Sequence, residues 1–260
     1  MPDFPPGTPS WADLAAPDKE AAAHFYSGLF GWEAEAAGPP EETRGYSFFK
    51  LDGKQVAGFG PPGPGEPPSW RTYVATADAD ETTSKVRDAG DNVVLEPMDV
   101  MDVGRMAVFM DTTGAVICVW QPKEHRGADV VNEPGSYAWS ELSTREPQKA
   151  EPFYTAVFGW EPRTNPMNGG SYTTWHLDDK AVAGMIEMGQ DWPTEVPSHW
   201  LIYFAVDDTD GAADKARELG GGVTVPPRDI PEVGRFAVLS DPNGAHFCVI
   251  ALAPEMKEAR

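Results

Sequence analysis

The chain is poor in basic residues and in cysteine, and it has no long apolar run. Its 260 residues include 41 acidic and 20 basic side chains, for a formal net charge of −21. Nucleic acids and anionic membranes bind basic surfaces, so we expect neither as a partner. No apolar stretch reaches the ~18 residues of a membrane span. The N-terminal MPDFPPGTPSW lacks the pattern of a signal peptide, so we expect a soluble cytoplasmic protein.

A long internal repeat dominates what is present. Residues 104–118, GRMAVFMDTTGAVIC, return 130 positions later as residues 234–248, GRFAVLSDPNGAHFC. In each copy apolar runs flank an Asp-x-x-Gly turn, a pattern typical of a β-hairpin. The two cysteines, Cys118 and Cys248, close the two copies. Equivalent positions of separate domains are not expected to form a disulfide, and nothing indicates an oxidising compartment.

The repeat extends over almost the whole chain. Residues 24–33 match residues 152–161, and residues 51–58 match residues 177–184. The pattern predicts two tandem domains, residues 1–122 and 136–260, joined by a linker at residues 123–135. Each half is read as two βαβββ units, which places the fold in the α+β class. Pro152 falls inside the first helix of the second half, so we expect that helix to start late or to be kinked.

The recurring helix motif Phe-Tyr-x-x-x-Phe-Gly-Trp, with the Asp-x-x-Gly hairpin, resembles the vicinal oxygen chelate superfamily. That superfamily includes glyoxalase I, bleomycin-resistance proteins and extradiol dioxygenases. The chain is most similar to its tandem two-domain, glyoxalase-like members, some of them labelled hydroxylases. The resemblance implies that each half curls its strands into a cupped, incomplete barrel. It does not imply one reaction, because the superfamily contains lyases, dioxygenases and binding proteins without catalytic activity.

The resemblance also implies which strand positions would hold a metal ion. Metal-using members place His or Glu at the first, fifth and last strands of a cup. These positions fall on Trp11, Arg71 and Cys118 in the first half and on Trp139, Leu201 and Cys248 in the second. Indole, guanidinium and aliphatic groups do not bind metal ions. We therefore expect no metal and no cofactor.

A set of polar and aromatic side chains should line the two cups instead. Asp13 and Glu141 each lie two residues after a cup tryptophan, so strand alternation turns them to the same face. Each carboxylate is either a ligand acceptor or general base with a raised pKa, or a group bonded to the backbone of a neighbouring strand. The expected ligand-binding residues are Trp11, Asp13, Arg71, Tyr73, Cys118, Trp139, Glu141, Tyr203 and Cys248.

Two of these residue types also have a structural interpretation. Arg71 either holds an anionic ligand or pairs with Asp13 inside the protein. The two cysteines are interpreted as small buried apolar residues. Outside the cups, Arg105 and Arg235 follow the repeated glycines and are predicted to anchor the hairpins, with a carboxylate as the candidate partner.

The preferred hypothesis is a small-molecule-binding protein without the usual metal ligands, which sequesters a planar organic metabolite or drug. One alternative is a metal-dependent lyase or dioxygenase with a shifted site in the second half, formed by Glu141, Glu187, His246 and Cys248. Another is a protein-interaction module with vestigial pockets. Catalysis is left open, and a reaction, if present, would be of the lyase or oxidoreductase type. We expect a monomer or a loose homodimer.

Overall fold

The computed structural model describes residues 2–90, 92–167 and 170–254. The elements of the first half are β1 (Pro9–Ala15), α1 (Lys19–Phe30), β2 (Glu33–Ala36), α2 (Pro40–Thr43), β3 (Ser47–Leu51), β4 (Lys54–Gly60), β5 (Ser69–Ala75), α3 (Ala79–Asp88), β6 (Asn92–Val100), β7 (Gly104–Met110) and β8 (Val116–Pro122). Those of the second half are β9 (Tyr137–Thr144), α4 (Pro147–Phe158), β10 (Glu161–Met167), β11 (Gly170–Leu177), β12 (Lys180–Glu187), β13 (His199–Ala205), α5 (Thr209–Glu218), β14 (Gly222–Ile230), β15 (Gly234–Ser240) and β16 (His246–Leu252).

The strands form two 8-stranded mixed sheets with the same topology. The first has the order β2-β3-β4-β1-β5-β8-β7-β6, and the second has the equivalent order β10-β11-β12-β9-β13-β16-β15-β14. Each sheet therefore consists of two four-stranded units joined where β1 pairs with β5, or β9 with β13, in antiparallel fashion. The predicted α+β class and the paired βαβββ units are confirmed.

The first helix of each half has the same length, 12 residues. Asp18 caps α1 by accepting from the Ala21 N–H, and Gly31 ends it in the left-handed conformation at φ 74°. Helix α4 begins at Pro147 and contains Pro152. The expected late start was wrong, because Pro147 occupies the first turn, where proline is favoured. None of the helices in the described ranges is long and apolar enough to cross a membrane.

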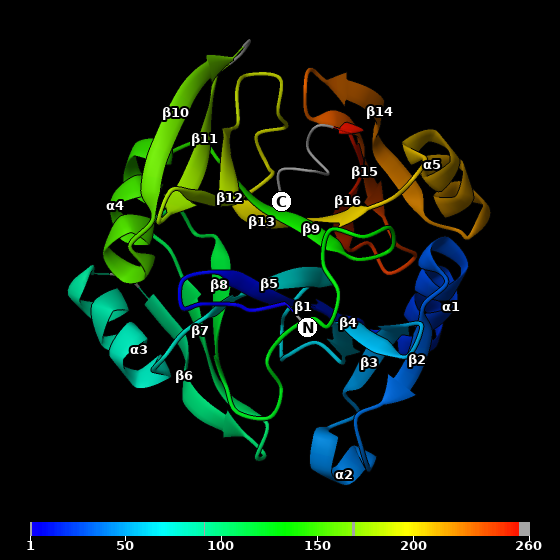
Figure 1. Ribbon diagram of the computed structural model, residues 1–260, viewed down its shortest axis with the longest axis horizontal. Helices are drawn as coiled ribbons and strands as arrows, with labels where there is room; N and C mark the ends of the chain where they lie inside the picture. Colours follow the sequence, from blue (N-terminus) through cyan, green and yellow to red (C-terminus); the bar gives the residue numbers. More distant parts are fainter. Residues whose placement is uncertain (1, 91, 168–169, 255–260) are drawn as a thin grey trace.

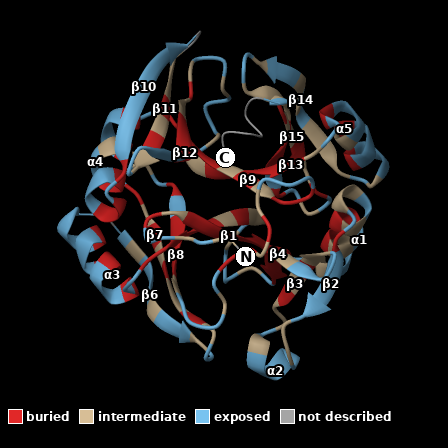
Figure 2. Cartoon of the chain, in the orientation of Figure 1, coloured by how far each residue is buried: buried red, intermediate tan, exposed pale blue. Residues whose placement is uncertain are grey.

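The hydrophobic core lies between the two sheets and crosses the boundary between the halves. Helix α1 lies beside α5, and α3 beside α4, on opposite sides of the molecule (Figure 1). One cluster joins Phe25 and Trp32 to Phe204 and Phe247 of the other half. Figure 2 shows buried residues on the central strands and on the inward faces of the helices. Each half therefore covers the apolar helices and strands of the other.

The two repeated motifs are partners across this boundary. The Tyr26 hydroxyl, from the helix motif, donates to Asp241 Oδ2 of the hairpin in the other half, at 3.3 Å. Tyr154 donates to Asp111 in the symmetry-related contact, at 2.7 Å. The motif tryptophan of the second half also crosses over, because Trp160 Nε1 donates to the Gly7 carbonyl at 2.7 Å. The sequence motifs that identify the fold are thus the contacts that join its halves.

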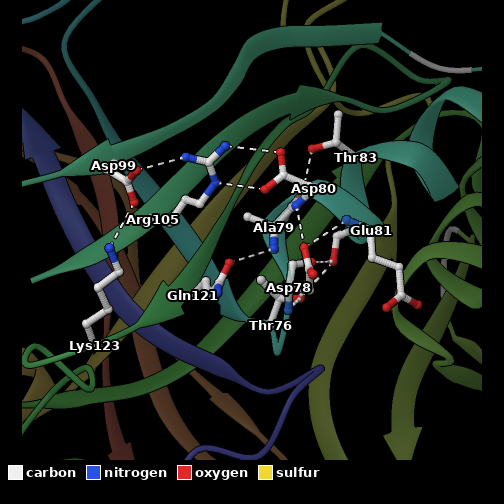
Figure 3. Close-up of polar contacts among 11 residues, drawn as sticks. Thr76, Asp78, Ala79, Asp80, Glu81, Thr83, Asp99, Arg105, Gln121 and Lys123 are labelled. Carbon is white, nitrogen blue, oxygen red and sulfur yellow. Dashed lines mark hydrogen bonds and ion pairs between the residues drawn. The ribbon is translucent and has the colours of Figure 1, made fainter.

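The hairpin arginines anchor their strands to a neighbouring helix, as predicted. Arg105 holds both carboxylate oxygens of Asp80, in the first turn of α3, at 2.8 and 3.0 Å, and it also contacts Asp99 (Figure 3). Arg235 makes the equivalent bidentate contact with Asp210, at 2.6 and 2.9 Å. These arginines therefore lie on the helix side of each sheet.

Candidate functional site

Each sheet presents a second face, turned away from the core between the sheets, which we call the first cup and the second cup. In the first cup, Trp11 pairs with Tyr73, Tyr73 with Cys118, and Asp13 with Arg71 across neighbouring strands. In the second cup, strand pairing joins Trp139 with Tyr203, Tyr203 with Cys248, and Glu141 with Leu201. Directly opposed residues point to the same face of a sheet. The structure thus brings the predicted residues together in two equivalent clusters.

The carboxylate of the first cup is fully partnered. Asp13 Oδ1 accepts from Arg71 Nε at 2.6 Å, and Asp13 Oδ2 accepts from the hydroxyls of Tyr73 and Tyr46 at 3.0 and 3.3 Å. Arg71 also lies 3.4 Å from Glu66. The interpretation of Arg71 as an internal ion-pair partner is confirmed. The interpretation of Asp13 as bonded to backbone is wrong, because its partners are side chains.

The segment between the two halves covers the first cup. The His125 ring packs edge-on against Trp11, with centroids 4.4 Å apart, and within 6 Å of Phe48 and Trp120. Trp120 Nε1 donates to the His125 carbonyl at 2.7 Å, and Ala128 N donates to the Ser10 carbonyl. Burial lowers the pKa of His125 to about 4, so the ring is neutral at pH 7. The first cup therefore already holds an aromatic ring of the chain itself.

The carboxyl group of the second cup lies in a different environment. Glu141 is 7% exposed, and its Oε1 accepts from the Tyr203 hydroxyl at 3.0 Å. Leu201 stands opposite it, where the first cup has Arg71. Burial raises the pKa of Glu141 to about 7, although hydrogen bonds from Tyr203 and Tyr172 act in the opposite direction. The carboxyl group of Glu141 can therefore gain or lose a proton near neutral pH. Like Asp13, Glu141 is bonded to side chains and not to the backbone of a neighbouring strand.

One feature of each cup was not predicted from the sequence: a tyrosine hydroxyl lies over a glycine of the neighbouring strand. Trp139 Nε1 donates to the Tyr172 hydroxyl at 3.2 Å, just as Trp11 donates to Tyr46 at 3.1 Å. The Tyr172 hydroxyl lies over Gly184, where a Cβ atom would overlap it. Tyr46 and Tyr172 recur at the same offset as the repeated stretch at residues 51–58, a signal that could have identified them.

The second cup is also lined by smaller side chains at two positions. Thr174 takes the place of Phe48, since each lies opposite the glycine that pairs with the cup carboxylate. Ile250 takes the place of Trp120, because each follows its cup cysteine by two residues. The aromatic side chains that enclose His125 are thus absent from these two positions of the second cup.

Comparison with known proteins identifies the family to which this architecture belongs. The family model described as Glyoxalase/Bleomycin resistance protein/Dioxygenase superfamily matches residues 8–119 and 125–249. The chain belongs to this superfamily. The predicted resemblance is confirmed, in both halves.

Relatives in the glyoxalase/bleomycin-resistance/dioxygenase superfamily match along their whole length. The chain is 42% identical to "Putative glyoxylase CFP32" of Mycobacterium tuberculosis, over 97% of this chain and 98% of that protein. It is 43% identical to "Anthracycline biosynthesis protein DnrV" of Streptomyces peucetius, over 97% and 96%. The names of these relatives describe those proteins.

Solved structures with the same fold are more distant in sequence. The Mn(II)-bound glyoxalase from Novosphingobium aromaticivorans is 16% identical, with a TM-score of 0.66, over 95% of this chain and 82% of that chain. The 2,3-dioxygenase LapB from Pseudomonas sp. KL28 is 13% identical, with a TM-score of 0.67, over 98% and 96%. At these identities the likeness establishes the fold alone.

The donor chemistry of this superfamily member does not fit the metal that the fold accommodates elsewhere. The three expected ligand positions of the second cup carry the indole of Trp139, the isobutyl group of Leu201 and the thiol of Cys248. Burial raises the pKa of Cys248 well above its usual range, and that of Cys118 to about 12, so both thiols stay protonated. A protonated thiol is a poor metal ligand.

The alternative metal set is not assembled either. Among the residues that the structure describes, no three His, Cys, Asp or Glu side chains are placed to share a metal ion. His246 is exposed at the start of β16, Cys248 is buried, and Glu187 accepts a hydrogen bond from Ser171 at 3.0 Å. The described residues therefore do not bring Glu141, Glu187, His246 and Cys248 together as a shifted metal site.

Proposed function

We propose that the protein binds a planar aromatic molecule bearing a hydroxyl group in its second cup, without using a metal ion. The observation that carries this proposal is the environment of Glu141, a buried carboxyl group that faces Leu201 and tyrosine hydroxyls and has no cation among its described partners. A carboxyl group of this kind gains from accepting a ligand hydroxyl, because the protein leaves part of its hydrogen-bonding capacity unused.

Aromatic lining supports the class of ligand. Trp139 is half-buried beside Glu141, while Tyr203 and Phe236 stand 6.4 Å apart, centroid to centroid. Flat rings favour flat ligands through stacking and edge contacts. The first cup illustrates the principle within the same chain, because His125 packs there against Trp11.

The name of one relative agrees with this class. DnrV of Streptomyces peucetius is called an anthracycline biosynthesis protein. Anthracyclines are fused, planar ring systems with phenolic hydroxyl groups. A ligand of that shape suits a cup in which Thr174 and Ile250 replace two aromatic side chains. The second cup, and not the covered first cup, is the proposed site, so each chain should bind one molecule.

The test is titration of the purified protein with 2-naphthol and 1-hydroxyanthraquinone, followed by calorimetry and tryptophan fluorescence. We expect saturable binding of one molecule per chain, weakened about tenfold or more by Trp139→Ala, since aromatic contacts contribute about 1–3 kcal/mol. Trp11→Phe, which keeps a ring in the first cup, is the matched control and should leave the affinity unchanged. Absence of saturable binding, or equal loss in both variants, would refute the proposal.

A further inference from the structure

Arg228 is a cation at the edge of the second cup with no ion-pair partner in the described part of the chain. Its guanidinium carbon lies 5.1 Å from the centroid of the Phe236 ring, and its side chain is exposed. The protein carries 41 acidic residues against 20 basic ones, and other arginines, such as Arg217 and Arg235, are paired with carboxylates. What distinguishes Arg228 is its contact with an aromatic ring of the second cup, because its charge is held at that cup and is not paired with a carboxylate of the described residues.

Strand register places Arg228 on the cup face. Along the β14–β15 pair, Arg228 lies opposite Phe236, and Asp229 lies opposite Arg235. Arg235 turns to the helix side, because it binds Asp210 of α5. Successive residues of a strand alternate between faces, so Arg228 and Phe236 turn to the other side, into the second cup.

A continuous row of contacts runs from this edge to the floor of the cup. The Arg228 guanidinium carbon lies over the Phe236 ring, the Phe236 and Tyr203 ring centroids are 6.4 Å apart, and the Tyr203 hydroxyl donates to Glu141 at 3.0 Å. One end of the row offers a hydrogen-bond acceptor, the middle offers two aromatic rings, and the other end offers a positive charge. The corresponding pair in the first cup is Met98 opposite Met106, which carries no charge.

We infer that Arg228 forms an anion-binding subsite of the second cup, so that the ligand is an aromatic hydroxy acid whose hydroxyl reaches Glu141 and whose carboxylate reaches Arg228. The guanidinium group binds carboxylates through two parallel hydrogen bonds, and its cation–π contact with Phe236 holds it at the edge of the cup. The strongly negative protein would otherwise repel an anionic ligand, and a local unpaired cation offsets that repulsion. This inference rests on the proposed function and narrows its ligand class.

The experiment compares 6-hydroxy-2-naphthoic acid with its methyl ester, which differ in charge and share the planar ring and hydroxyl. Wild-type protein should bind the acid about three- to fivefold more tightly than the ester at low salt, as expected for one solvent-accessible charge pair. Arg228→Met should abolish that preference while changing ester affinity less than about twofold. Arg228→Lys should restore part of it, and Arg217→Met is the control for loss of one positive charge elsewhere.

The outcomes separate the two proposals. If the acid and the ester bind wild-type protein equally, or if Arg228→Met weakens both to the same extent, the anion subsite is refuted and the aromatic site stands. If neither compound binds with saturation, both the subsite and the proposed function fail. A preference for the acid that disappears in 0.5 M salt, a concentration chosen because it screens exposed charges, and that is lost in Arg228→Met supports the inference.

Discussion

Leu201 lies directly opposite Glu141 in the antiparallel pairing of β13 with β9. The equivalent position in the first half holds Arg71, which binds Asp13 at 2.6 Å. The first cup therefore pairs its carboxylate with a cation, whereas Glu141 faces an aliphatic side chain and has a pKa raised by burial to about 7. Two domains with the same topology therefore differ in the partner of their cup carboxylate.

Leu201→Arg should convert the second cup to the chemistry of the first. The new guanidinium would pair with Glu141 and lower the pKa of that carboxyl group from about 7 toward its ordinary range. We expect the affinity for 2-naphthol to fall about tenfold, because the carboxylate oxygens would be occupied. Carboxyl-region NMR titration measures the pKa, and Leu201→Met is the control. An unchanged Glu141 titration would contradict this account.

The stability of the protein should depend on the proton held by Glu141. Its folded pKa of about 7 lies above the ordinary value near 4.3. The stability gained from that proton is complete below pH ~4.3 and is lost as the pH rises to ~7, by about 4 kcal/mol in all. Urea unfolding of wild type and Glu141→Gln measures the difference. The wild type should lose stability relative to the variant between pH 4.5 and 8, values chosen to bracket this window, and a constant difference would show that Glu141 has an ordinary pKa.

His125 should produce the opposite dependence. Its folded pKa of about 4 lies below the ordinary value near 6.5, so the unfolded chain binds a proton that the folded ring does not. Stability should therefore rise by about 2 kcal/mol between pH ~4 and ~6.5. This value is reduced for solvent screening, because the ring is partly exposed. His125→Phe keeps an aromatic ring against Trp11 and removes the titration. If the variant still loses the same stability on acidification, His125 is not the cause.

The glycines beneath the cup tyrosines offer a matched pair of substitutions. A Cβ atom on Gly184 would overlap the Tyr172 hydroxyl, and one on Gly58 would overlap Tyr46. Either change to alanine should cost about 1–3 kcal/mol of stability through overpacking. Gly184→Ala alone should weaken ligand binding, because it displaces a hydroxyl that bonds Glu141. Equal binding loss in both variants would place the ligand outside the second cup.

The contacts between the halves predict a difference between two tyrosines. The Tyr154 hydroxyl donates to Asp111 at 2.7 Å and accepts from Trp200 Nε1 at 2.9 Å. Tyr154→Phe leaves both partners buried, so unfolding should become easier by about 1–3 kcal/mol. Tyr26→Phe breaks a longer contact with Asp241, 3.3 Å, and should cost less. Urea denaturation compares the two, and a larger loss in Tyr26→Phe would contradict the ranking.

Much of this fold could be predicted because its evidence is local. The alternation of residues along a strand places Trp139 and Glu141 on one face, and the repeat predicts the same for Trp11 and Asp13. Pro147 and Pro152 show the limit of such reasoning, since a helix start depends on which proline lies in the first turn. The position of His125 in the first cup could not be predicted, because this residue comes from the linker and has no counterpart in the repeat among the described residues.

The sequence by itself determined the repeat, the two βαβββ units of each half and the shared face of Trp11 with Asp13 and of Trp139 with Glu141, because strand and helix periodicity are properties of neighbouring positions. Only the tertiary structure decided that Tyr26 and Tyr154 contact the opposite half, and that Glu141 lacks the cation that Asp13 has. Burial and proton affinity depend on groups brought together from distant strands. A one-dimensional pattern does not contain those distances, so the exchange of Arg71 for Leu201, although visible in the sequence, did not by itself reveal the different environments of Asp13 and Glu141.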